Sequence, residues 1–408
     1  MSISPDAPAA KAAGPATAAP HGAPAAILTL AFGGLFIGTG EFASMSLLPG
    51  MAYSTGVSIP AAGSYISAYA CGVVVGAPLI AALGARWSRK RLLLALLAIC
   101  VIGYAASALA WNAPSLLLGR FLSGLPHGAY YGVAALVAAA LVPLHRRAQA
   151  IGHVMLGLAA ANVVGVPAAT WLGQALGWRM AFCAVAVGCI ATAAMIALFV
   201  PAIMPARGIS ARTELAGLRS PQLWLTLGVA SIGFGGMFAV YSYITPTLTE
   251  VTGLRLESVP MALVTWGLGM VAGNLIGGWL ADRALVPAIF GMLMWNAVFL
   301  GLFSLTAGSP GWALPTLFLI GNGFALVPAL QARLMHIAGQ SQTLAAALNH
   351  SAFNAANAIG ATLGGFAIAQ GLGWSSTGWV GGLLALGGLV LMALARGASA
   401  AADVRRAD

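Results

Sequence analysis

Long apolar runs recur along the whole chain, and they constrain its fold more than any other feature. A helix needs about 20 consecutive apolar residues to cross a bilayer, and the 408 residues, 60% hydrophobic and 6% charged, supply many such runs. Strands of a membrane barrel would instead alternate polar and apolar residues. The sequence therefore predicts an all-α integral membrane protein with twelve transmembrane helices, at 26–49, 61–84, 91–110, 115–141, 150–174, 179–201, 223–247, 258–281, 285–307, 312–335, 342–370 and 375–396.

Basic residues predict the orientation of these helices. If the N-terminus lies inside, fifteen of the 18 lysines and arginines fall in cytoplasmic loops and tails. The opposite loops hold only Arg179 and Arg255, and Arg120 lies within a span. Because cytoplasmic loops are enriched in basic residues, we expect both termini in the cytoplasm and a location in a bacterial-type inner membrane. The net charge of +10 then reflects topology, and no nucleic acid is expected as a partner.

An internal repeat divides the chain into two similar halves. Pro49 and Pro246 close the first and seventh spans, 197 residues apart, and "GAPLIAALGAR" (76–86) matches "GNLIGGWLADR" (273–283) at the same offset. "AANVVG" (160–165) and "AANAIG" (355–360) match at an offset of 195. Such a duplication predicts two pseudo-symmetric six-helix bundles with a cavity between them that opens alternately to each side. The predicted parts are a disordered cytoplasmic tail at 1–25, a bundle at 26–201, a cytoplasmic linker at 202–222, a second bundle at 223–396 and a cytoplasmic tail at 397–408.

With these features the chain resembles the major facilitator superfamily over about residues 25–398. "LLLGRFLSG" (116–124) is similar to the pattern of the fourth span in that family, with Arg120 as its arginine. "GTGEF", "LPHGAYYG" and "GVPAATWLGQALGWR" resemble more narrowly the drug and sugar proton-antiporter branch, which includes the arabinose-efflux and sugar-efflux permeases. "GVPAATWLGQ" (165–174) resembles the antiporter motif of the fifth span, where Gly165 and Pro167 are expected to bend the helix.

The loop signature of the family is present in one half and degenerate in the other. "GWLADR" (278–283) matches it, whereas "AALGAR" (81–86) has Ala85 where the aspartate belongs, and Ser88 replaces a glycine. The first half therefore lacks the aspartate on which a cytoplasmic latch would be based. The resemblance implies a cytoplasmic gate formed by Arg86, Arg89, Asp282 and Arg283.

Glu41 is an acid inside an otherwise apolar span. Ionisable groups in spans are costly and usually face a cavity. Pro49 follows eight residues later, which places Glu41 about 12 Å below that end of the helix. Because desolvation penalises the anion, Glu41 is a candidate proton carrier, and a permanently charged Arg120 at a similar depth would favour the anion instead. The alternatives are a structural acid and a static arginine clamp.

Two polar stripes supply further candidates. Residues 120, 124, 127 and 131 share one helical face, which makes His127 a possible proton relay and Tyr131 a possible substrate contact. A second stripe in the eleventh span offers donors and acceptors without fixed charge, and a tyrosine in the seventh span could stack on a ligand. Packing is the alternative for each of the candidate substrate contacts, which are Tyr131, Tyr241, His350, Asn354 and Asn357.

The chain carries no sequence motif for a metal, a nucleotide or an enzyme, and no cofactor is expected. Transport would then be driven by a proton gradient. The favoured function is proton-coupled efflux of a small organic compound by a monomer in the lipid bilayer. The alternatives are a symporter or facilitator that imports a nutrient, and an intramembrane enzyme that uses His127 or His350.

Overall fold

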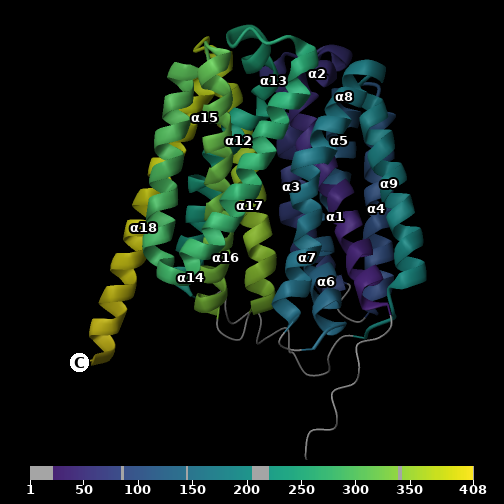
Figure 1. The fold of residues 1–408 in the computed structure, drawn as a ribbon, viewed down its shortest axis with the longest axis vertical. Coiled ribbons are helices and arrows are strands. Elements are labelled where there is room, and N and C mark those ends of the chain that lie inside the picture. Colours follow the sequence, from purple (N-terminus) through teal and green to yellow (C-terminus); the bar gives the residue numbers. More distant parts are fainter. Residues whose placement is uncertain (1–21, 84–86, 144–145, 205–219, 339–341, 408) are drawn as a thin grey trace, which may run out of the picture.

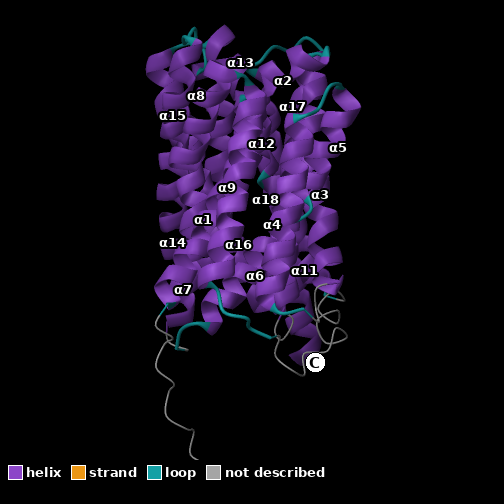
Figure 2. Ribbon diagram, turned by 90° about the vertical axis from the view of Figure 1, so that its right-hand side faces the viewer, coloured by secondary structure: helices purple, strands orange, loops and turns teal. Residues whose placement is uncertain are grey.

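A computed structural model describes residues 22–83, 87–143, 146–204, 220–338 and 342–407, and every regular element in these ranges is helical (Figure 2). The long helices run side by side along one axis, in two groups that follow the two halves of the sequence (Figure 1). We call the end that carries α2 and α13 the upper end and the opposite one the lower end. The described chain begins and ends at the lower end, as an even number of crossings requires.

The first half contains six crossings and a short helix at the upper end. Its fourth crossing is divided in two, and its fifth contains a π-helical stretch. The elements are α1 (Ala23–Ser46), α2 (Leu48–Thr55), α3 (Ile59–Leu83), α4 (Arg89–Ala108), α5 (Ala113–Gly124), α6 (His127–Ala140), α7 (Arg147–Ala160), a π-helix (Ala161–Gly165), α8 (Val166–Leu176) and α9 (Trp178–Phe199).

Local sequence explains several of these boundaries. Ser88 caps α4 by accepting a hydrogen bond from the Arg91 amide, and Asn112 with Ser115 forms a capping box at the start of α5, as these residue types favour. Helix α5 ends in the middle of this crossing, because Pro126 lacks the amide that would continue the α-helical ladder from α5 into α6. The predicted span at 115–141 is therefore present as two consecutive helices, α5 and α6.

The second half contains the remaining six crossings. Its elements are α11 (Pro221–Gly228), a π-helix (Val229–Gly233), α12 (Gly235–Ser242), α13 (Ile244–Pro246), a π-helix (Thr247–Val251), a 3₁₀ turn (Leu256–Ser258), α14 (Val259–Thr306), α15 (Pro310–Asn322), a 3₁₀ turn (Gly323–Ala325), α16 (Leu326–Ala338), α17 (Gln342–Ala369) and α18 (Ser376–Ala407).

Helix α14 makes two crossings rather than one. Gly273 and Asn296 would lie about 35 Å apart along a straight helix of 1.5 Å rise per residue. A methyl group on Gly273 would nevertheless meet the backbone of Asn322, and Asn296 Oδ1 lies against the next residue, Gly323. The chain therefore folds back at Ala284, whose φ of −156° and ψ of 79° leave the helical region. The predicted spans at 258–281 and 285–307 are its two arms, joined without the expected loop.

Ten helical stretches in the described ranges are long and apolar enough to cross a membrane. One of the ten contains both arms of α14, and the α5–α6 pair adds a further crossing, which gives the twelve that the sequence predicts. At the end of the chain, helix α18 continues to Ala407 through the predicted tail at 397–408. Most of the predicted linker and of the N-terminal tail lies outside the described residues.

Contacts between neighbouring helices repeat at the same offset in both halves. A methyl group on Gly72 would meet the Phe121 carbonyl oxygen, and one on Gly269 would meet that of Phe318, 197 residues later in each case. The indole N–H of Trp178 donates to Ser54 at 2.9 Å, and that of Trp374 donates to Glu250 at 2.6 Å, both across 124 residues. The two bundles are therefore pseudo-symmetric in their packing as well as in their sequence.

Candidate functional site

The buried carboxyl group of Glu41 lies where the two halves meet. Its side chain is 4% exposed, in the upper part of α1. The Nδ2 atom of Asn357 on α17 donates a hydrogen bond to Oε1 at 3.4 Å. The Nδ1 atom of His127 on α6 lies 3.6 Å from Oε2, just beyond hydrogen-bond distance. One carboxyl group thus faces a partner from each half.

Tyr69 on α3 extends this cluster. Its hydroxyl lies 2.9 Å from His127 Nδ1, so that the histidine nitrogen lies between a phenol and a carboxyl group. All three side chains are at most 4% exposed. Glu41 and His127 can be selected from the sequence because they are ionisable residues in apolar spans. Tyr69 cannot, because an uncharged aromatic residue is ordinary in such a span.

Arg120 is fully buried beside Glu41 but does not pair with it directly. Its guanidinium donates to the Gly40 carbonyl oxygen at 3.2 Å and to Ser44 Oγ at 3.0 Å, and it lies 4.5 Å above the centre of the Tyr69 ring. The positive charge therefore lies against the turns of α1 on both sides of Glu41. The direct contacts of the Glu41 carboxyl group are therefore His127 and Asn357. Arg120 lies close to Glu41, as expected, but contacts Gly40 and Ser44 of α1 instead of the carboxyl group.

The remaining polar candidates connect this cluster to the lower part of the interface. The Tyr131 hydroxyl donates to the Gly34 carbonyl oxygen at 2.8 Å, and its ring stacks on His350 of α17, with centroids 5.8 Å apart and planes inclined by 11°. Asn354 donates to the His350 carbonyl oxygen within α17, while its Oδ1 atom, like that of Asn357, is buried and has no hydrogen-bond partner among the described residues. Two carbonyl oxygens of this stripe are thus available to a ligand.

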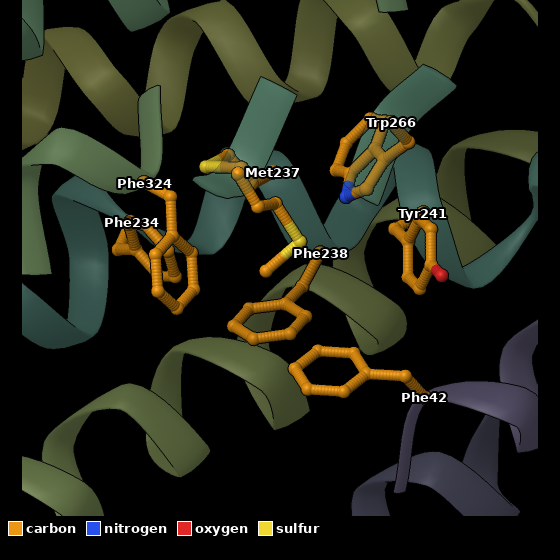
Figure 3. A pocket seen from close by; sticks show the side chains of 8 residues that line it. Phe42, Phe234, Met237, Phe238, Tyr241, Trp266 and Phe324 are labelled. Carbon is orange, nitrogen blue, oxygen red and sulfur yellow. The ribbon is translucent and has the colours of Figure 1, made fainter. Parts of the chain in front are cut away.

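An aromatic pocket with little free space is lined by Phe42, the residue that follows Glu41 in α1 (Figure 3). About 10 Å³ of free space remains in it, which is roughly the room for one water molecule. Tyr241 and Trp266 pack with centroids 4.7 Å apart, and Figure 3 shows Phe42 of the first half opposite Phe238 of the second. The lining consists of Phe42, Phe234, Met237, Phe238, Tyr241, Trp266, Met270 and Phe324. The structure thus places Tyr241 in this pocket, whose lining includes none of the candidate residues of α17.

Hydrogen bonds between the halves also occur nearer the upper end. Thr245 donates to the Ser46 carbonyl oxygen at 2.7 Å, and Gln174 donates to that of Leu256 at 3.0 Å. Gly63 on α3 has no side chain, and the Tyr243 hydroxyl of the second half occupies the space where one would lie. In the described residues the interface is therefore closely packed from Glu41 to the upper end.

Three of the four predicted gate residues can be placed. Arg89 begins α4, and its amide donates to the Ile203 carbonyl oxygen. Asp282 and Arg283 are both exposed on α14, and the Arg283 guanidinium stacks on Trp279 at 3.5 Å. None of the three belongs to an ion pair within the described residues, and Arg86 lies outside them. A latch between these charges therefore stays a prediction.

The predicted bend in the fifth crossing coincides with a change of helix type. Gly165 ends the π-helical stretch, and Pro167 is the second residue of α8. A π-helical turn interrupts the α-helical ladder and is often found at functional sites. A methyl group on Gly165 would meet the Thr39 hydroxyl of α1, two residues before Glu41. This stretch therefore packs on the part of α1 that carries the acid.

Two matched bundles of membrane-spanning helices with a polar cluster between them define a secondary transporter. A buried acid that contacts both bundles can couple its charge to their relative position, and no such requirement exists for an enzyme. The Major Facilitator Superfamily pattern matches residues 30–343, so that the chain belongs to this family of transporters.

Known proteins place the chain within the family. It is 42% identical over 372 residues to the inner membrane transport protein YdhP of Escherichia coli K12, covering 90% of this chain and 94% of that protein. It is 34% identical to a chloramphenicol resistance protein of Streptomyces lividans, with 88% and 91% covered, and 31% identical to a probable sugar efflux transporter of Helicobacter pylori G27, with 85% and 89% covered. The predicted resemblance to the efflux branch is confirmed.

A solved structure supports the fold independently. The chain aligns with a peptide transporter, POT, crystallised with sulfate, with a TM-score of 0.72 at 16% identity, over 91% of this chain and 94% of that one. At this identity the likeness concerns the fold alone. The predicted class, twelve transmembrane helices in two pseudo-symmetric bundles, is confirmed.

Proposed function

We propose that this transporter expels a small organic compound from the cytoplasm in exchange for protons. In this proposal it acts as a monomer in the inner membrane, with both termini in the cytoplasm, so that the upper end faces outward. No cofactor takes part, because the proton gradient supplies the driving force. Glu41 carries the proton, and Arg120 and His127 adjust how well the site tolerates the anion.

The observation that carries the proposal is the position of the Glu41 carboxyl group between His127 of one half and Asn357 of the other. A protonated carboxyl group can lie in a dry interface between the halves, whereas an anion there must be compensated by charge or hydrogen bonds. Loss or uptake of one proton therefore changes the free energy of closing this interface. A change of that kind is what alternating access needs in order to be coupled to a gradient.

Substrate would bind in the same interface from the cytoplasmic side. Tyr131, His350, Asn354 and Asn357 supply the polar contacts in this proposal, and the close packing at the upper end keeps the bound compound from the outside. Rearrangement of the halves about the site would then open the upper end. The direction of transport rests on the resemblance of residues 165–173 to the antiporter motif and on relatives whose names refer to efflux or resistance.

The experiment is a substrate screen on inverted membrane vesicles that contain the protein. Respiration acidifies their lumen, and a pH-sensitive dye reports the gradient. An exported compound added to the medium should discharge the gradient, and vesicles without the protein should not respond. If only compounds loaded into the lumen discharge it, the protein is an importing symporter. If no compound moves protons in either arrangement while labelled substrate equilibrates, it is a facilitator.

A further inference from the structure

The aromatic pocket and the polar cluster occupy corresponding places in the two halves. At the offset of 197 that relates Pro49 to Pro246, each central member of the polar cluster matches a residue that lines the pocket. The three central pairs are Glu41 with Phe238, Tyr69 with Trp266, and His127 with Phe324.

Packing supports this correspondence independently of the sequence offset. A methyl group on Gly124 would meet the Tyr69 carbonyl oxygen, and one on Gly321 would meet that of Trp266. Equivalent pairs of helices therefore meet at Tyr69 in the first half and at Trp266 in the second. The helix breaks agree as well, because Pro126, between α5 and α6, matches Gly323 at the start of the 3₁₀ turn.

We infer that the halves of this transporter have divided two tasks between equivalent places: the first half holds the proton-carrying groups, and the second half holds the receptor for the aromatic ring of an uncharged substrate. The assignment rests on the proposed transport function and adds the substrate class to it. The pocket has no charged lining residue, so it offers nothing to compensate an ionic ring substituent. Its aromatic faces and two methionines favour a flat apolar group; a cation could also be attracted to the aromatic faces, which is why a cation is included among the competitors below.

Two polar groups on residues that line the pocket define the substrate class further. The Tyr241 hydroxyl and the Trp266 indole N–H are on side chains that are each 2% exposed. Neither has a hydrogen-bond partner in the parts of the chain that the structure describes. Because both residues line the pocket, an oxygen of a bound ligand could accept a hydrogen bond from either group. The expected substrate is therefore a neutral aromatic compound that carries a hydrogen-bond acceptor.

Phe42 connects the pocket to the proton site. It follows Glu41 directly in α1, and its ring lies 6.3 Å from that of Phe238 and 6.0 Å from that of Tyr241. Because the pocket has little free space in this arrangement, a ring can enter only if Phe42 or the methionines move. Movement of α1 at Glu41 would carry Phe42 with it, so that occupancy of the pocket and the charge state of Glu41 act on one segment.

The test is equilibrium binding to the purified full-length protein in lipid nanodiscs, at one pH and without a gradient. The probe is radiolabelled chloramphenicol, a neutral nitrobenzene with amide and hydroxyl groups, in competition with other neutral aromatic compounds, tetraphenylphosphonium and D-xylose. We expect saturable binding that neutral aromatic compounds displace and the pentose does not. Phe238→Leu and Trp266→Ala should raise the Kd roughly three- to tenfold, as the loss of one ring contact implies.

Matched variants separate the pocket from general damage. Phe366→Leu and Trp379→Ala alter side chains of the same types that are 62% and 54% exposed, and they should leave the Kd within about twofold. Trp266→Tyr places at this position the residue type found at Tyr69, and it should bind more tightly than Trp266→Ala. The inference is overturned if none of the neutral aromatic probes binds saturably, if D-xylose or the cation displaces the label best, or if the pocket and control variants bind alike. None of these outcomes depends on proton coupling, so proton-coupled export could still hold if the pocket assignment failed.

Discussion

Asn357 and Glu41 are 316 residues apart in the sequence, yet the amide nitrogen of one lies 3.4 Å from a carboxyl oxygen of the other. Each comes from a different bundle, so this contact exists only while the bundles are close together at this level. Its strength depends on the charge of the carboxyl group, because hydrogen bonds to an ionised acceptor are roughly twice as strong as neutral ones. A proton on Glu41 would therefore alter a contact that helps to hold the halves together.

The first prediction concerns Glu41→Gln, which keeps the size of the side chain but cannot ionise. Uphill transport driven by a pH gradient in proteoliposomes should be abolished, while exchange of labelled for unlabelled substrate continues and no longer varies with pH. Glu257→Gln, which alters an acid that is 78% exposed, is the control and should transport normally. Normal accumulation by the Glu41 variant would assign Glu41 a structural role and make His127 the next candidate.

The second prediction concerns Arg120→Lys. A lysine keeps the charge but is a point donor, and it cannot reproduce the planar fork that reaches both the Gly40 carbonyl oxygen and Ser44 Oγ. Loss of one charge-assisted hydrogen bond should lower the free energy of unfolding by about 1.5–3 kcal/mol, and transport should fall with it. Thermal unfolding in detergent measures the first effect. Arg255→Lys, at a side chain that is 80% exposed, should change neither, and equal behaviour of the two variants would contradict a specific role for the guanidinium.

The third prediction concerns closure of the upper end. A methyl group in Gly63→Ala would overlap the Tyr243 hydroxyl, so the halves should separate there. Spin labels at positions 53 and 257, in a background without the native cysteines, should report a longer distance. Adding Tyr243→Phe removes the overlapping oxygen and should restore the shorter distance. Gly132→Ala, where no atom lies within 4 Å of the new methyl group, is the control. Failure of the double variant to recover would show that the contact does not set the closure.

The fourth prediction concerns Asn354→Ala. The Oδ1 atom of Asn354 is buried and has no partner in the part of the chain that the structure describes, so a substrate donor is its expected contact. Loss of one hydrogen bond should raise KM roughly two- to tenfold with little change in expression. Asn162→Ala is a matched control, because Asn162 also donates to the carbonyl oxygen four residues earlier and also has an unpaired Oδ1. Equal effects of the two variants would indicate that both amides only pack helices.

The fold could be predicted from two features that are directly visible in the sequence, the apolar runs and the internal repeat. Runs of apolar residues specify the crossings, and the repeat pairs them into halves, so the twelve spans could be predicted with boundaries that differ mainly at helix ends. The break inside the fourth crossing is harder to predict, because Pro126 acts on a single turn. In a crossing that is apolar throughout, one residue changes the composition of the span very little.

The candidate site could be predicted only as far as charge marks it. Glu41, Arg120 and His127 stand out because polar groups are costly in a membrane, and the structure places them together. Tyr69 and Phe42 do not stand out, since aromatic residues are ordinary in apolar helices. Their importance comes from which helices meet, and that is a property of the three-dimensional packing.

The breaks in the fourth and tenth crossings have a mechanical consequence. Each crossing consists of two short rods with a joint between them, after Gly124 in one half and after Asn322 in the other. The α-helical hydrogen-bond ladder is interrupted at each break, so we expect each crossing to bend there more easily than along its regular turns. His127 is the first residue of its lower rod, and Phe324 lies within the other joint. The histidine of the polar cluster and a ring of the aromatic pocket thus lie at the two places where their crossings are expected to bend.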